Sequence, residues 1–98
     1  MSRSLRLHPA AQLELAEITA YYEAESAGLG ETFLAEAQHA FAQLVAFPEA
    51  FPISYGHVRV RVLAAFPYSV HFSLLGDDIL VLALAHHSRR PFYWRERE

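Results

Sequence analysis

The sequence has no cysteine and no lysine, and it has only one methionine and one tryptophan among its 98 residues. Without cysteine the chain forms no disulfide and offers no thiolate for catalysis or metal binding. A small chain without disulfides is typical of a reducing compartment, so we expect a cytoplasmic protein. All eight basic residues are arginine, which favours planar, bidentate contacts to carboxylate or phosphate groups. Codon usage that prefers arginine is the alternative explanation for the missing lysines.

Sequence motifs for membrane insertion, secretion, metal binding and common catalytic sites are also missing. No apolar run approaches the roughly 20 residues that a membrane-spanning helix needs, and residues 1–9 show no secretory apolar segment. The six histidines include no H-x-x-x-H pair, so we expect neither a metal site nor a cofactor. There is no glycine-rich phosphate loop and no nucleophile elbow. The pair Asp77-Asp78 falls in a predicted turn, where aspartate suits the backbone geometry alone.

The charges divide unevenly along the chain. Residues 1–49 hold two arginines and seven glutamates and so carry −5, whereas residues 50–98 hold six arginines and four acidic residues and so carry +2. This pattern predicts an acidic surface from the first half and a basic surface from the second. With 53% hydrophobic residues, residues 1–98 are expected to form one domain with a C-terminal tail from about residue 88 to residue 98.

Two amphipathic helices are predicted in the first half. Residues 10–27 are rich in alanine, leucine, glutamate and glutamine, which are strong helix formers, and Pro9 suits the first turn. The apolar stripe of this helix consists of Ala11, Leu15, Ile18 and Tyr22. The sequence Gly28-Leu29-Gly30 breaks the pattern, and a second helix is expected from about residue 29 or 31 to residue 46. Its apolar stripe consists of Phe33, Leu34, Ala37, Phe41, Leu44 and Val45.

The hydrophobic period then changes from 3.6 to 2, which predicts strands. Residues 58–63 alternate, with the valines expected to face inward and Arg59 and Arg61 outward. Residues 68–74 alternate again, and Leu75-Gly76-Asp77-Asp78 predicts a hairpin turn. Residues 79–85 are apolar without alternation, which indicates a strand covered on both faces. A further short strand is expected over residues 3–7, whereas residues 49–57 are expected to be an irregular connector.

The order strand, helix, helix, strand, strand, strand predicts an α+β fold. We expect an antiparallel two-helix hairpin packed on a mainly antiparallel four-stranded sheet. In this arrangement the arginines of the sheet gather on the face opposite the helices.

Two groups of basic residues are candidates for an anion site. Arg59 and Arg61 stand at positions i and i+2 of a strand, so their side chains point the same way. They bind an anion, or they form an ordinary solvated strand face. His86, Arg89 and Arg90 follow the buried strand, where a histidine can act as general acid or base and arginines can stabilise a phosphoryl transition state. The alternative is that the histidine caps the strand and the arginines fix the tail.

Tyr93 and Trp94 are aromatic candidates for binding, since they follow the rigid Pro91. They stack on a base or insert into a groove of a partner protein. The alternative is a tail that folds back onto its own core.

Several of these features occur together in a known family. They are Tyr21-Tyr22, Gly28-Leu29-Gly30-Glu31-Thr32-Phe33-Leu34, Pro48, Val58-Arg59-Val60, Phe66-Pro67-Tyr68 and His86-x-x-Arg89-x-Pro91-x-x-Trp94. In this order and spacing, over nearly the whole chain, the sequence resembles the RelE/ParE superfamily of bacterial toxins. The ParE-like branch, often labelled plasmid stabilisation, is the most similar.

The resemblance implies a toxin of a type II toxin-antitoxin system that a cognate antitoxin neutralises. Such antitoxins, here expected to be of the ribbon-helix-helix type, bind operator DNA themselves and wrap the toxin with a C-terminal segment, so the toxin meets DNA only indirectly. ParE-type members poison DNA gyrase, and RelE-type members cut mRNA in the ribosomal A site. From their chemistry, we expect the residues that bind the antitoxin or the target to be Arg59, Arg61, His86, Arg89, Arg90, Tyr93 and Trp94.

The charge balance favours a gyrase inhibitor, which is not an enzyme. A ribosome-dependent endoribonuclease must approach dense phosphate, and a net charge of −3 without lysine opposes that approach. For the ribonuclease alternative, the catalytic candidates are Arg59, Arg61, His86 and Arg89. A third alternative is a degenerate homologue that binds an antitoxin and is no longer toxic.

Overall fold

The computed structural model describes residues 3–97, in which two helices and five strands form two layers. The bounds are β1 Ser4–Leu7, α1 Pro9–Glu25, α2 Leu29–Ala46, β2 Ile53–Tyr55, β3 Val58–Val62, β4 Tyr68–Leu75 and β5 Asp78–His86. Short 3-10 turns occupy Pro48–Ala50 and Arg95–Arg97. None of the helices described between residues 3 and 97 combines the length and hydrophobicity that crossing a membrane requires.

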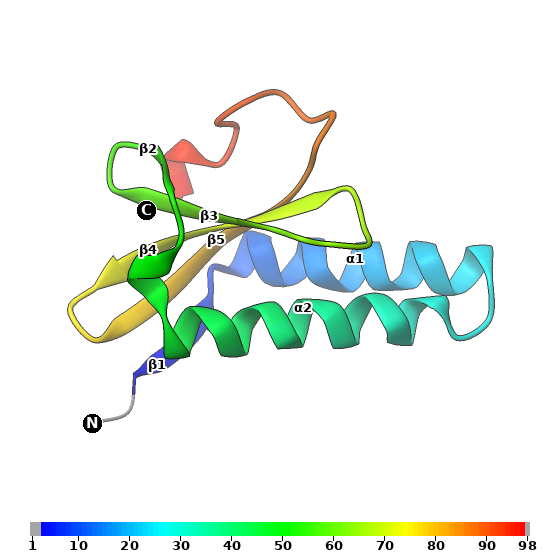
Figure 1. The fold of residues 1–98 in the computed structure, drawn as a ribbon. Helices are drawn as coiled ribbons and strands as arrows, with labels where there is room; N and C mark the ends of the chain where they lie inside the picture. Colours follow the sequence, from blue (N-terminus) through cyan, green and yellow to red (C-terminus); the bar gives the residue numbers. More distant parts are fainter. Residues whose placement is uncertain (1–2, 98) are drawn as a thin grey trace.

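The strands form one mixed sheet in the order β1-β5-β4-β3-β2. β1 runs parallel to β5, and the other neighbours are antiparallel. The α+β class is confirmed, but the sheet has five strands where four were predicted. The additional strand is β2, which lies in the segment expected to be irregular and is only three residues long. Figure 1 shows both helices along one side of the sheet and the C-terminal tail on the other.

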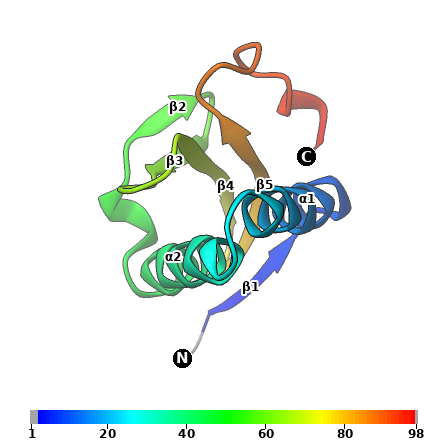
Figure 2. The same ribbon diagram turned by 90° about the vertical axis from the view of Figure 1, so that its right-hand side faces the viewer.

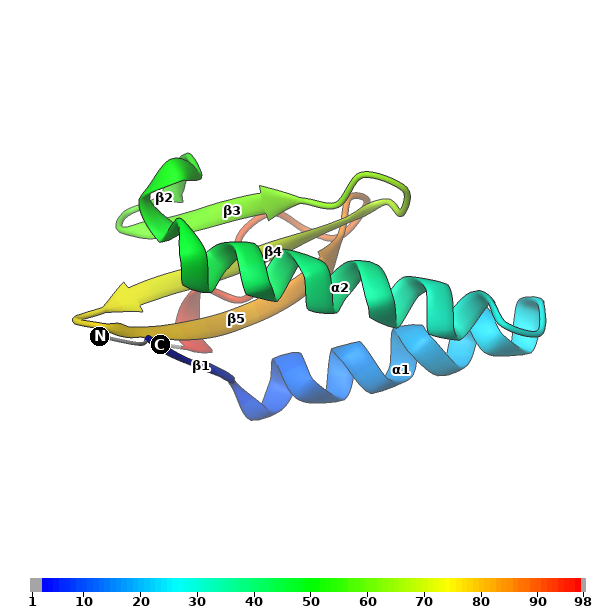
Figure 3. The ribbon, with the colours of Figure 1, turned by 60° about the horizontal axis from the view of Figure 1, so that its bottom comes forward.

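The helix hairpin forms as predicted, because both helices carry an apolar stripe toward the sheet. His8 caps α1 through its Nδ1 atom, which accepts a hydrogen bond from the Ala10 amide at 3.0 Å. The two helices pack closely at the start of α2, because a Cβ atom at Gly30 would lie 2.7 Å from the Thr19 carbonyl oxygen of α1. The Glu23 carboxylate accepts hydrogen bonds from the Gly28 and Gly30 amides of this link. The antiparallel course of the two helices is clear in Figure 3.

The main core lies between the helices and the sheet. Its buried members include Ala11, Ile18, Phe33, Ala37, Leu44, Val70, Phe72, Ile79, Val81 and Leu84. Residues from both predicted helix stripes take part. The alternate residues Tyr68, Val70, Phe72 and Leu74 of β4 belong to this layer as well. At roughly 1.5–3 kcal/mol for each large side chain removed from water, this layer supplies most of the hydrophobic stabilisation.

β5 is the central strand, and every residue from Ile79 to Ala85 is buried, as predicted. A bulge changes its alternation, since His71 of β4 pairs with Ala83 whereas Phe72 pairs with Val81, which leaves Leu82 unpaired. As a result Leu82 and Ala83 both face away from the helices.

A second, smaller core lies on the face of the sheet opposite the helices. It consists of Val58, Leu80, Leu82, Ala83 and Trp94, with Tyr93 at its border. Figure 2 shows the tail after β5 returning over this face, with the helices on the other side of the sheet. Hence the tail covers the sheet face that was predicted to expose arginines.

The prediction for the two faces of β3 is wrong. Arg59 pairs with Phe72 and Arg61 with Val70, both of which belong to the core under the helices, so the arginines point to the helix side. The valines point to the tail side, where Val58 is buried and Val62 is 54% exposed. The arginines are tolerated there because β3 lies near the sheet edge, where their stems cover apolar surface while their guanidinium groups reach polar acceptors.

Candidate functional site

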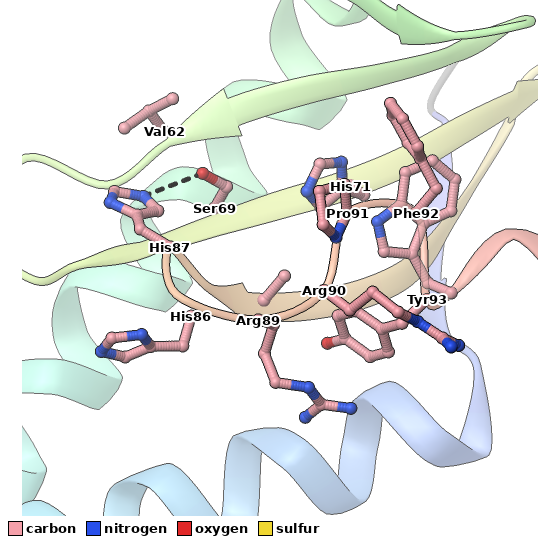
Figure 4. Close-up of a pocket in the computed structure, with 12 residues that line it drawn as sticks. Val62, Ser69, His71, His86, His87, Arg89, Arg90, Pro91, Phe92 and Tyr93 are labelled. Atoms are coloured by element: carbon pink, nitrogen blue, oxygen red, sulfur yellow. Dashed lines mark hydrogen bonds between the residues drawn. The ribbon is translucent and has the colours of Figure 1, made fainter.

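A cavity of about 390 Å³ opens between the sheet face and the tail. Its walls come from β3, β4, the end of β5 and the loop that follows (Figure 4). The lining residues are Val62, Ser69, His71, Ala85, His86, His87, Arg89, Arg90, Pro91, Phe92, Tyr93 and Trp94. We call this cavity the tail pocket. Its lining contains three histidines and two arginines and no acidic side chain, so it favours a negatively charged group.

The adjacent residues His86 and His87 have different surroundings. The His87 Nε2 atom lies 3.0 Å from the Ser69 hydroxyl of β4, on the tail side of the sheet. His86 packs edge-on against Tyr68, with ring centroids 5.0 Å apart, and its Nδ1 atom accepts a hydrogen bond from the Ser88 amide at 3.0 Å. Figure 4 shows the two imidazole rings on opposite sides of the chain. The Nδ1 bond also makes His86 a cap for the end of β5, which is one of the two roles considered for it.

His71 forms the inner wall of the tail pocket. Its ring stacks on Trp94 with centroids 4.7 Å apart, and Ser54 of β2 lies 3.5 Å from its Nδ1 atom. Burial lowers the pKa of His71 to about 4, because desolvation disfavours the imidazolium ion, and Glu14 only partly opposes this effect. His71 is therefore neutral at physiological pH.

The lowered pKa of His71 predicts a loss of stability in acid. Between pH 6.5 and about 4, an unfolded His71 takes up a proton that the folded protein excludes, so stability falls as the pH falls through this window. We expect this residue to contribute a loss of about 2–3 kcal/mol to the free energy of unfolding over that range. Urea unfolding at pH 7, 5.5 and 4.5 measures the loss. A His71→Phe variant keeps the stack on Trp94 and should show a flatter pH profile, whereas an unchanged profile would contradict the assignment.

The arginines of the tail differ in their contacts. The Arg89 guanidinium lies 3.8 Å from the centroid of the Tyr93 ring, a cation–π contact. Arg90 is exposed and has neither a hydrogen bond nor an ion pair to any side chain of residues 3–97. Arg90 is therefore available to a partner without breaking an existing contact.

Tyr93 ties the tail to α1. Its hydroxyl donates a hydrogen bond to Glu14 at 2.9 Å. Burial and this hydrogen bond raise the pKa of Tyr93 above its usual value. Arg97 donates two hydrogen bonds to the same carboxylate, each at 3.0 Å. Tyr93, predicted as a binding residue, thus has structural contacts that hold the tail in place.

Arg59 and Arg61 are brought together, but away from the tail pocket. The Arg61 side chain donates to the Gln43 amide oxygen of α2 at 3.0 and 2.7 Å, and to the Val62 carbonyl oxygen. Arg59 donates to the Phe51 carbonyl oxygen at 2.7 Å. Both guanidinium groups fasten the helix layer and the connector to β3. The predicted cluster of these arginines with Arg89 on one sheet face is therefore not formed.

Trp94 is 1% exposed and lies in the second core, so it offers no free surface for stacking on a base or a partner. The alternative of a tail folded onto its own core describes it correctly. In its place the structure exposes two aromatic residues that the sequence reasoning missed, Tyr55 and Phe92. Their ring centroids are 4.9 Å apart, and Phe92 belongs to the lining of the tail pocket.

A second hollow of about 670 Å³ runs along the outer face of the helix hairpin. It is lined by Gln12, Leu15, Ala16, Thr19, Ala20, Glu23, Gly30, Glu31 and Leu34. Small side chains along both helices make this surface concave, so it has the shape to receive an apolar segment of a partner. No group of histidine, cysteine or acidic residues within residues 3–97 is arranged to hold a metal ion.

Comparisons with known proteins agree with the fold. The structure titled "Chromosomal ParDE TA system from P. aeruginosa" is similar to the chain, with a TM-score of 0.63 and 22% sequence identity, and the match covers 87% of this chain and 96% of that one. The comparison with curated proteins gives no match. The family model described as "ParE toxin of type II toxin-antitoxin system, parDE" matches residues 5–91, which include every helix and strand except the first residue of β1. The chain therefore belongs to the ParE toxin family of type II toxin-antitoxin systems.

Proposed function

We propose that this toxin acts in the cytoplasm by inhibiting DNA gyrase, and that it does so by binding the protein rather than by catalysis. The observation that carries this proposal is the separation of its arginines. Arg59 and Arg61 are engaged on the helix side of β3, whereas Arg89 lies on Tyr93 in the tail beyond β5. A nuclease needs its acid, base and phosphate-binding groups around one scissile bond, and these residues do not surround one point.

The histidines of the tail pocket also support action by binding rather than by catalysis. His71 stays neutral under Trp94, and His86 is turned away from His87. Phe92 and Arg90 of the pocket lining are exposed, and so is Tyr55 beside Phe92. Tyrosine, phenylalanine and arginine are enriched at the centres of protein interfaces.

We place the antitoxin on the other side of the molecule, along the hollow of the helix hairpin. Its apolar side chains would fill the space between α1 and α2, and basic groups would meet Glu23 and Glu31 at the rim. Acidic groups of the antitoxin would meet the toxin's exposed arginines. We expect this partner to be of the ribbon-helix-helix type and to carry the DNA-binding surface of the complex.

A supercoiling assay with purified gyrase tests the proposal. Micromolar toxin should block the conversion of relaxed to supercoiled plasmid or trap cleaved DNA, and an equimolar amount of the protein encoded by the adjacent gene should restore activity. Unchanged supercoiling would contradict the proposal.

Primer extension on translated mRNA tests the ribonuclease alternative. A ribonuclease should produce codon-phased cuts with the wild type, and these cuts must disappear in His86→Ala and Arg61→Ala. Normal growth at high expression would instead favour a degenerate homologue.

A further inference from the structure

The backbone of Phe92 is strained. Phe92 has a φ angle of 60°, and among residues 3–97 it is the single residue other than glycine with a positive φ. Bulky side chains disfavour this conformation because Cβ approaches the backbone closely. Such strain persists where the surrounding structure imposes it, and it is concentrated at functional sites.

The strained conformation places an aromatic ring at the mouth of the tail pocket. The Phe92 ring is 37% exposed and lies 4.9 Å from Tyr55, which is 46% exposed. Trp94 supports both rings from below, with centroids 6.0 Å from Phe92 and 6.2 Å from Tyr55. Segments far apart in the sequence, β2 and the tail, thus build one aromatic surface. Neither outer ring is buried, so core packing alone does not explain why the strain is kept.

The tail pocket that Phe92 lines also carries an unpaired positive charge. Arg90 lies two residues before Phe92 and has no acidic partner among residues 3–97. His87 lines the same pocket, whose lining contains no carboxylate. A pocket that combines an exposed aromatic ring with an unpaired guanidinium is complementary to a segment that carries both an apolar side chain and a carboxylate.

From this juxtaposition we infer that Tyr55, Phe92 and Arg90 form the surface that binds the toxin's target, and that they receive an acidic protein segment. We call these three residues the aromatic rim. The inference rests on the proposed function, in that the target is a protein. A nucleic acid fits less well, because the whole chain carries a charge of −3 and only a few cations surround the rim.

A Phe92→Gly substitution separates this function from a structural role. Glycine adopts a positive φ without strain, and this relief offsets part of the packing that is lost with the ring, so the variant should stay folded with a melting temperature close to that of the wild type. Because it also removes the ring, we expect growth arrest on expression to be lost and gyrase inhibition to fall at least tenfold. Binding of the antitoxin, which we place on the helix hairpin, should be unchanged. Phe47→Ala removes a 68% exposed aromatic ring elsewhere and is the matched control, with activity retained.

Charge reversal tests whether the segment that binds the aromatic rim is acidic. Arg90→Glu should abolish growth arrest, whereas Arg95→Glu, at another exposed arginine of the tail, should not. If Phe92→Gly remains as toxic as the wild type, or loses toxicity only together with folding, the inference is wrong. If the rim variants lose binding of a labelled single-stranded RNA or DNA oligonucleotide, the partner is a nucleic acid and the protein assignment is overturned. A wild type that arrests growth without affecting gyrase removes the gyrase proposal alone, and loss of that arrest in Phe92→Gly would still support the rim.

Discussion

Replacement of Trp94 by alanine is expected to lower the free energy of unfolding by about 3–5 kcal/mol, the range measured when large aromatic core residues are truncated. In a domain of this size such a loss corresponds to a decrease of roughly 12–40 °C in the melting temperature. The reason is that Trp94 is 1% exposed and fills the second core against Val58, Leu80, Leu82 and Ala83. Within residues 3–97 it is the single fully buried aromatic side chain of that core.

Thermal and urea unfolding, followed by circular dichroism, measure this change. Trp94→Phe keeps an aromatic ring in the slot and should lose less, whereas Phe47→Ala removes an exposed ring and should stay within about 0.5 kcal/mol of the wild type. A Trp94→Ala variant as stable as the control would mean that the tail does not dock as described. Because Trp94 also supports Tyr55 and Phe92, loss of toxicity in this variant would not identify Trp94 as a contact residue.

The main fold could be predicted because periodic patterns report burial directly. The stripes of α1 and α2, the hairpin at Gly76 and the continuous burial of Ile79–Ala85 were all predicted from spacing and turn chemistry. These features depend on the local sequence and on burial against the main core, and both leave a periodic pattern in the chain. β2 was missed because a strand of three residues is too short to establish a period.

Strand alternation identifies two faces but does not say which face meets which layer. For β3 the usual assumption that valines face the main core fails, because this sheet is covered on both sides and the valines belong to the second core. The placement of Arg59 and Arg61 beside Gln43 depends on contacts with a helix far away in the sequence. For this reason the prediction that Arg59 and Arg61 lie on the face opposite the helices was wrong.

The aromatic rim was beyond sequence reasoning for a different reason. Tyr55 and Phe92 lie 37 positions apart in the sequence, and the positive φ of Phe92 has no local sequence signal such as a glycine. The nearest signal in the sequence was Pro91, which restricts the backbone just before the turn. The prediction named Tyr93 and Trp94, which follow this proline, as binding residues. In the structure these two residues anchor the tail, whereas Phe92 is exposed.

Removal of the Glu14 carboxylate is the second large effect that we expect. Glu14 accepts hydrogen bonds from the Leu84 amide at 3.1 Å, from the Tyr93 hydroxyl and from Arg97. β1 pairs with β5 only as far as Val81, so the edge of β5 beyond that residue has no neighbouring strand. Glu14 satisfies the Leu84 amide there, and Arg97 donates to the Leu82 carbonyl oxygen at 3.0 Å.

Glu14→Ala therefore leaves a buried amide without its acceptor and a partly buried guanidinium without its counter-ion. We expect a loss of about 2–4 kcal/mol in the free energy of unfolding, less than for a fully buried pair because solvent screens part of the charge. Glu17→Ala, at an exposed glutamate of the same helix, is the matched control and should lose less than about 0.5 kcal/mol. A loss as small as in the control would show that water replaces the carboxylate without cost.

The single tryptophan makes the consequence for the tail observable. If Glu14 and Trp94 hold the tail jointly, Glu14→Ala should shift the Trp94 emission to longer wavelength under native conditions, as the indole becomes hydrated. An unshifted emission together with reduced stability would mean that apolar burial of Trp94 is sufficient to dock the tail, and that Glu14 serves the edge of β5 alone. A double-mutant cycle with Arg97→Ala separates these cases, because a shared anchor gives a coupling energy of at least about 0.5 kcal/mol, whereas independent contacts add.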